Sequence, residues 1–251
     1  MSTTPTPALP SASFGGGLRA FARGASFIVT TPALWLAAAA PIAAWLVMFA
    51  MVGGGAAHFV MRGINENMTL TETIERVLGA LAGFIGAFLA ATALAQPLAG
   101  PALDVLVERR RAALGLPVGP KQRLRDTLPR ALGVTMLGLA VSLPLLALLW
   151  LASMLVPVLS PVFVILKFVV LALTVAWDFL DYPFGVEGMR LGERIAFMRA
   201  HFGLVLGFGV AAALVLLVPC VGLVVLPMGV VGATDALFFG RTAVSRYPPT
   251  S

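Results

Sequence analysis

The sequence between Ala33 and Val60 contains no lysine, arginine, aspartate or glutamate. This run is longer than the roughly 20 apolar residues that an α-helix needs to cross a bilayer. It restricts the fold, because backbone groups in lipid must bond to one another, and only helices and closed barrels achieve this. A barrel would show segments of about ten residues with alternating polarity, which these uniform apolar runs lack. The sequence therefore predicts an all-helical, multi-pass integral membrane protein.

The composition supports this class and excludes others. Of the 251 residues, 59% are hydrophobic and only 11% are charged, too few to cover the surface of a soluble domain. The net charge of +6 is mostly arginine, which we interpret as basic cytoplasmic loops rather than a nucleic-acid surface. A single cysteine and two isolated histidines provide no metal site. The sequence lacks hydrolase and nucleotide-binding motifs, so we expect neither an enzyme nor a cofactor.

Charge also predicts the topology. The segment Gln96–Arg130 carries a net charge of +4, so it should lie on the cytoplasmic side. A second span is predicted over Val77–Ala95, after a helix-capping signal at Thr71. The polar loop Arg62–Arg76 is then external, and the N-terminus is cytoplasmic.

Two later apolar blocks each resemble a helical hairpin. The first is Ala131–Leu180, divided by Val156–Pro161. The second is Phe202–Gly240, divided at Pro219-Cys220 and again at Pro227. Its arms are short for full spans, so these hairpins need not cross the bilayer completely. Both return the chain to its side of entry, which predicts a cytoplasmic C-terminus.

The remaining segments are less apolar. Residues 1–13 are rich in Ser, Thr and Pro and are predicted to be a disordered tail, while residues 14–251 should form a single helical membrane domain. Two amphipathic helices are expected to lie in the membrane interface. Their predicted apolar faces are Phe14, Leu18, Phe21, Ala25 and Ile28 in the first, and Leu191, Ile195, Met198 and Phe202 in the second.

A polar stripe interrupts the second arm of the first hairpin. Lys167, Thr174 and Asp178 lie within about 20° of one line along a helix. Polar groups at membrane depth are costly and normally face protein or water, so the stripe indicates a substrate pathway in which Lys167 contacts an anion. The alternative is that Lys167 extends toward the interface and Asp178 serves as a cap or ion-pair partner.

Asp181, Tyr182 and Pro183 follow this stripe. Pro183 disfavours helical conformation at Tyr182, so the arm should end there. We expect a structural ion pair between Asp181 and either Arg190 or Arg194.

Acidic residues also precede the arginine run of the basic segment. Asp104 and Glu108 are like charges one helical turn apart, and Arg111 is placed to pair with Glu108. Asp104 then needs a partner from elsewhere. The run Arg109–Arg111 is interpreted as a topology signal and a contact for anionic lipid.

Several of these stretches resemble one family. The sequence DYPFGVEGMRLGERIAFMRAHFGLVLGFG, beginning at Asp181, resembles the aromatic-Asp-Tyr-Pro segment of CysZ-like sulfate permeases, a domain shared with the etoposide-induced-protein-2.4 group. Downstream, Pro219, Pro227 and Gly232 match the family's pattern of two prolines followed by Gly-Ala-Thr. The segment that starts at Gln96 is similar to its proline-led helix with acids before a basic run. This likeness implies a gating or assembly role for Asp104 and Glu108 as one hypothesis.

The resemblance implies a bundle of two long spanning helices and two hairpins, assembled as a homo-oligomer. It implies a permease or channel of the bacterial inner membrane that takes up a small inorganic anion, sulfate, for cysteine biosynthesis. It assigns structural roles to Asp181, Tyr182, Pro183 and the downstream Pro-Pro-Gly pattern. However, Leu34-Trp35-Leu36 stand where the family's bacterial members commonly carry a basic pair. A non-transporting scaffold or a transporter of another solute is therefore the alternative.

Overall fold

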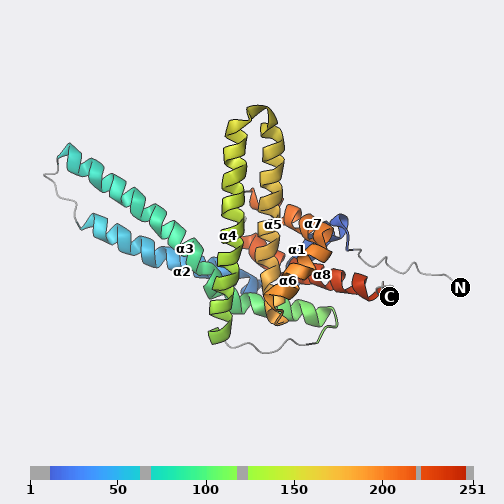
Figure 1. Ribbon diagram of the computed structural model, residues 1–251. Helices are drawn as coiled ribbons and strands as arrows, with labels where there is room; N and C mark the ends of the chain where they lie inside the picture. The colour runs from blue at the N-terminus through green and yellow to red at the C-terminus, as the bar shows by residue number, and fades with distance from the viewer. Residues whose placement is uncertain (1–11, 63–68, 118–123, 219–221, 247–251) are drawn as a thin grey trace. The chain divides into compact units, whose positions relative to one another are not determined.

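The computed structural model describes residues 12–62, 69–117, 124–218 and 222–246, and these residues form helices and no strand. The chain divides into two compact units, residues 36–102 and the remainder, which are described separately. The elements (Figure 1) are α1 (Phe14–Thr30), η1 (Pro32–Leu34), α2 (Trp35–Met61), α3 (Leu70–Ala113), α4 (Leu124–Leu155), η2 (Pro157–Leu159), α5 (Ser160–Val186), α6 (Leu191–Ala200), α7 (Phe202–Leu216) and α8 (Gly222–Arg246).

Five helices of the described chain are long and apolar enough to cross a membrane. These segments are Pro32–Gly55, Leu70–Ala91, Met136–Leu155, Pro157–Val186 and Val224–Thr242. The first four expose most of their side chains, as expected of helices that face lipid, whereas the fifth is mostly buried within the chain. The predicted all-helical, multi-pass class is confirmed.

The core of the larger unit forms where α1 packs against α7 and α8, with α5 beside them (Figure 1). Small residues allow the backbones to approach closely at these crossings. A Cβ atom at Gly17 would overlap the backbone of α7 at Leu204 and Phe208. A Cβ atom at Gly24 would lie 2.5 Å from the Cα atom of Gly232 in α8. Bulkier residues at Gly17 or Gly24 would push these helices apart.

The buried face of α1 differs from the face predicted from the sequence. Phe21 and Ile28 are buried as expected, but Phe14 and Leu18 are exposed. Glycine and alanine complete the buried face, because the neighbouring helices lie too close for larger side chains. In α6, the predicted apolar residues Leu191 and Ile195 are also exposed. Outward apolar side chains suit a helix whose surroundings include lipid.

Helix α5 does not end at Tyr182, so that prediction is wrong. The helix includes Pro183 and continues to Val186. The chain then leaves it through a Schellman motif, in which Gly188 adopts φ +69°. In this motif the Gly188 N–H donates to the Gly185 carbonyl at 2.8 Å, and the Met189 N–H donates to the Phe184 carbonyl at 3.0 Å. One further turn therefore follows the proline before the glycine ends the helix.

Helix α3 is one continuous 44-residue helix, rather than a span followed by a separate basic helix. Its capping box consists of Thr69 and Glu72, two residues before the capping signal predicted at Thr71. The Thr69 N–H donates to the Glu72 carboxylate at 2.9 Å, and the Glu72 N–H donates to the Thr69 hydroxyl at 3.4 Å. At the other end Gly115, with φ +71°, forms a second Schellman motif.

The first hairpin is confirmed, because α4 and α5 pack side by side and are joined by η2 within the predicted break (Figure 1). The second consists of α7 and α8, which also contact each other. Pro227 does not divide its second arm, since it lies inside the continuous helix α8. Pro219 lies outside the described residues.

In the smaller unit, aromatic rings join α2 to the first half of α3. The rings of Trp45 and Phe49 stack with centroids 5.0 Å apart. Phe88 and Phe84 of α3 pack edge-on against them, at 5.6 Å and 5.3 Å respectively. These contacts stabilise a long antiparallel pair, as the predicted first two spans require.

Candidate functional site

Three arginines and two carboxylates form a buried ion-pair cluster in the larger unit. They come from the basic end of α3, the end of α5 and the second half of α8. Burial of a charge is tolerated only when an opposite charge and hydrogen bonds compensate for the lost water. The arginine–carboxylate cluster consists of Arg110, Arg111, Glu187, Asp235 and Arg241.

Arg110 and Asp235 form the innermost pair of the cluster. The Arg110 Nε and Nη2 atoms donate to the two oxygens of Asp235 at 2.7 Å and 2.6 Å, a bidentate geometry. The Asp235 side chain is 0% exposed and the Arg110 side chain is 13% exposed. The guanidinium also lies over the ring of Phe27, 4.5 Å from its centroid. Helices α3, α8 and α1 are thus tied together at one point.

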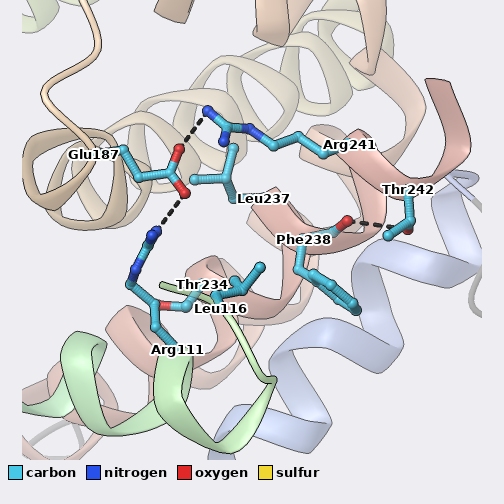
Figure 2. Close-up of a pocket in the computed structure, with 8 residues that line it drawn as sticks. All are labelled: Arg111, Leu116, Glu187, Thr234, Leu237, Phe238, Arg241 and Thr242. Carbon is cyan, nitrogen blue, oxygen red and sulfur yellow. Dashed lines mark hydrogen bonds and ion pairs between the residues drawn. The ribbon is translucent and has the colours of Figure 1, made fainter. Parts of the chain in front are cut away.

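Glu187 lies between two arginines. Figure 2 shows its carboxylate with one oxygen toward Arg111 and the other toward Arg241, and both pairs are within salt-bridge distance. Arg111 also donates from Nη2 to the Pro117 carbonyl at 3.1 Å. Arg111 and Glu187 are each 8% exposed, whereas Arg241 is 54% exposed. The bridge therefore runs from the interior toward the surface.

The two Schellman motifs explain why these side chains meet. Arg111 lies in the last turn of α3, and its carbonyl accepts the Leu116 N–H at 2.9 Å. Glu187 is the C-cap residue of α5. The chain turns sharply at the glycine after each helix, Gly115 and Gly188. Both side chains therefore lie at a helix end rather than along a packed face.

A cavity of about 170 Å³ adjoins this bridge. Its lining combines the three charged residues with the hydroxyls and apolar side chains of α8 (Figure 2). The lining residues are Arg111, Leu116, Glu187, Thr234, Leu237, Phe238, Arg241 and Thr242. Within the described part of the chain, no three His, Cys, Asp or Glu residues are arranged to hold a metal ion.

The predicted pathway residues lie on α5, but the structure does not join them into one polar network. Lys167 donates from Nζ to the Ser153 hydroxyl of α4 at 3.0 Å. The Thr174 hydroxyl donates to the Val170 carbonyl of its own helix at 2.9 Å. Asp178 is exposed. Lys167 therefore connects the two arms of the first hairpin, and its hydrogen bond leads to α4 rather than to Thr174 or Asp178.

The predicted pairing of Glu108 with Arg111 is wrong. Glu108 is exposed, and Arg111 instead reaches Glu187 on α5. Asp104 is partly buried. Of the arginine run, Arg109 remains exposed, while its two neighbours are buried in the cluster. A lipid contact by the whole run is therefore excluded.

Glu187, Asp235 and Arg241 were not predicted in any role, Arg110 was predicted only as part of the basic run, and Arg111 was assigned the wrong partner. Asp235 carried a usable signal, since it is an acid within the apolar run of α8 and such residues normally have a buried partner. Its partner could not be identified, because Arg110 is 125 positions away in the sequence.

The comparison with protein families agrees with this helical architecture. The family model described as "Sulfate transporter CysZ/Etoposide-induced protein 2.4" matches residues 20–227. The chain belongs to this family. Proteins named sulfate transporter CysZ from two strains of Pseudomonas aeruginosa are each 27% identical to it over 229 residues, covering 85% of this chain and 90% of the relative. A third, from Pseudomonas paraeruginosa, is 28% identical over the same coverage.

The first residues that resemble the CysZ-type motif lie in the last turns of α5. Asp181 forms an ion pair with Arg194, one of the two predicted partners, and the Arg194 Nε donates to the Met189 carbonyl at 3.0 Å. Tyr182 is half-buried and Pro183 is buried. This ion pair connects α5 to α6, which is bent by 91° from α7.

The downstream part of the CysZ-type motif lies in α8. Pro227 is buried inside the helix. A Cβ atom at Gly232 would lie 3.0 Å from the Ala20 carbonyl oxygen and from the Phe21 Cα atom of α1. Gly232 thus permits the close crossing of α1 and α8.

Proposed function

We propose that this protein carries a small oxyanion, sulfate, across the membrane as a permease or channel. The observation that carries this proposal is the match to proteins named sulfate transporter CysZ, which extends over 85% of this chain and 90% of theirs. The family model extends over residues 20–227, which include the first four of the five candidate spans. Five helices suited to spanning a bilayer supply the architecture that transport requires.

The membrane placement is part of the proposal. The excess of lysine and arginine between α3 and α4 favours a cytoplasmic position for that segment, and hence for both termini. We place the chain in a bacterial inner membrane, where residues 14–251 act as one helical domain within a homo-oligomer. The apolar surfaces of α4 and α5 are available for lipid or for a second copy.

Lys167 is the residue of the predicted pathway that the geometry supports best. Its ammonium group forms no ion pair within the described residues and contacts the Ser153 hydroxyl, whose proton is directed to the Trp150 carbonyl at 2.6 Å. A cation at membrane depth without a carboxylate partner attracts an anion strongly. We propose that Lys167 contacts the passing anion, with Thr174 and Asp178 further along the same arm.

The test is sulfate flux into liposomes that contain the purified protein. Lys167→Leu should lower the flux by about tenfold or more, the factor for one charge-assisted hydrogen bond. Lys167→Arg should retain most of the flux because the charge remains. Ser153→Ala is the matched control, since it removes the hydroxyl partner and leaves the ammonium in place.

Two results would contradict the proposal at different levels. Full flux by Lys167→Leu would remove Lys167 from the pathway and leave transport intact. Absence of sulfate flux by the unaltered protein, with normal folding, would contradict sulfate transport. Parallel measurements with phosphate and chloride would then distinguish a transporter of another anion from a scaffold.

A further inference from the structure

The cavity beside Glu187 is lined by none of the residues of the pathway predicted along α5. The charges around it are not matched one to one. The surrounding arginine–carboxylate cluster contains three guanidinium groups and two carboxylates, which leaves a net charge of +1. Asp235 is committed to Arg110 through two hydrogen bonds. A single carboxylate, Glu187, therefore serves both Arg111 and Arg241.

The hydrogen-bonding capacity of these arginines is also not filled. Each guanidinium offers five N–H donors and no acceptor. The Arg111 Nε atom is buried and has no hydrogen-bond partner among the described residues. An unsatisfied buried donor costs free energy, so a cavity that holds one favours an added acceptor.

We propose that this cavity is a binding site for a tetrahedral oxyanion, and that Glu187 occupies the anion's place as an internal counter-ion. A carboxylate and a sulfate or phosphate group present similar paired oxygens to a guanidinium, and both bind it in bidentate geometry. When Glu187 is displaced, Arg111 and Arg241 together carry a charge of +2, which a dianion held between them neutralises. The proposal rests on the proposed function, for which it assigns a second anion site.

The location of Glu187 permits this exchange. It is the C-cap residue of α5, and its carboxylate forms ion pairs with Arg111 and Arg241. Rotation of its side chain away from Arg111 and Arg241 therefore leaves the hydrogen bonds of α5 in place. The cavity volume of about 170 Å³ is several times the volume that one water molecule occupies in the liquid, so the cavity has room for a five-atom anion.

Arg241 provides the route of access. It is half-exposed and also borders a second, more open cavity with Met189, Glu193 and His201. An anion can therefore reach Arg241 from outside and pass inward to Arg111. Two sources share the required chemistry: free sulfate, and the phosphate of an anionic lipid headgroup.

The experiment measures binding of radiolabelled sulfate to the purified full-length protein in detergent. Glu187→Gln should bind sulfate at least about tenfold more tightly than the unaltered chain, because the competing carboxylate is neutralised while its shape is kept. Adding Arg241→Gln to that variant should reverse the gain. Arg109→Gln is the matched control, since Arg109 is the exposed neighbour of the cluster on α3.

Size-exclusion chromatography and thermal unfolding verify that each variant is folded. If Glu187→Gln is folded and its sulfate affinity is unchanged, the proposal is overturned. The second test is Arg241→Gln alone, which alters a half-exposed residue and should weaken sulfate binding. Competition by added phosphatidylglycerol, with none by neutral lipid, supports the same site and identifies lipid as a source. Flux is measured separately, so sulfate binding without flux would contradict transport while supporting the site.

Discussion

The substitution Asp235→Asn should destabilise the protein strongly, although it preserves the shape of the side chain. The substitution removes the negative charge that receives both hydrogen bonds from Arg110. Asp235 is fully buried, and the Arg110 side chain is only 13% exposed, so water cannot replace the lost carboxylate without a rearrangement.

The magnitude follows from this burial. Removing one partner of a buried ion pair costs about 3–5 kcal/mol, because the other charge is left uncompensated. We expect about 3 kcal/mol for Asp235→Asn, since Arg110 keeps its contact with Phe27 and its small exposure. Arg110→Met should cost as much or more, because it leaves a completely buried carboxylate. For a chain of this size, 3 kcal/mol corresponds to a decrease in Tm of roughly 6–12 °C.

The assay is thermal unfolding in detergent, followed by tryptophan fluorescence, for Asp235→Asn and for a cycle made of Arg110→Met, Asp235→Leu and the double variant Arg110→Met/Asp235→Leu. Replacing a buried ion pair by apolar residues of similar volume is often nearly neutral. The double variant should therefore be more stable than the two separate losses predict, with a coupling free energy of about 3 kcal/mol or more. If the two losses simply add, Arg110 and Asp235 do not form a coupled buried ion pair.

Two further substitutions test the helix contacts. Gly24→Leu should lower the free energy of unfolding by more than about 4 kcal/mol, or prevent folding, because α1 and α8 cannot then approach each other. The control is Gly192→Ala, which has open space around it and should change the free energy of unfolding by about 1 kcal/mol or less. A monodisperse, equally stable Gly24→Leu protein on size-exclusion chromatography and heating would refute the crossing. Asp181→Asn should cost about 3 kcal/mol because it removes the carboxylate that pairs with the buried Arg194, whereas the exposed Arg190→Gln should be nearly neutral in the same melting assay.

The sequence predicted features that depend on residues close together in the chain. Apolar runs located the spans, and the prolines around Val156–Pro161 located the turn of the first hairpin. The ion pair between Asp181 and Arg194 was also predicted, because its partners are separated by only 13 positions. Local spacing is sufficient in these cases, since helix geometry limits which neighbours can meet.

The ends of the helices were harder to predict. Proline rules indicated a break at Tyr182, but the helix tolerates Pro183 and ends only where Gly188 can adopt a positive φ. Similarly, α3 runs past the predicted end of its span. In a buried or lipid-exposed helix, packing and the lack of competing water can offset the loss of one hydrogen bond.

The charged cluster could not be assembled from the sequence at all. Arg111 and Glu187 are 76 positions apart, and Arg110 and Asp235 are 125 apart. Helical periodicity contains no information about pairs at such separations. It therefore directed Arg111 to the nearest available acid, Glu108, which the structure leaves exposed.

The contact of α1 with α8 has a consequence for how the protein is made. The ribosome synthesises α1 long before α8, so the glycine face of α1 has no permanent partner during most of translation. The same delay applies to Arg110, whose carboxylate partner belongs to the last described helix. The core can therefore close only late in synthesis. A chain that ends before Asp235 would leave Arg110 without its carboxylate and the glycine face of α1 uncovered. Both features would allow membrane quality control to recognise the incomplete protein.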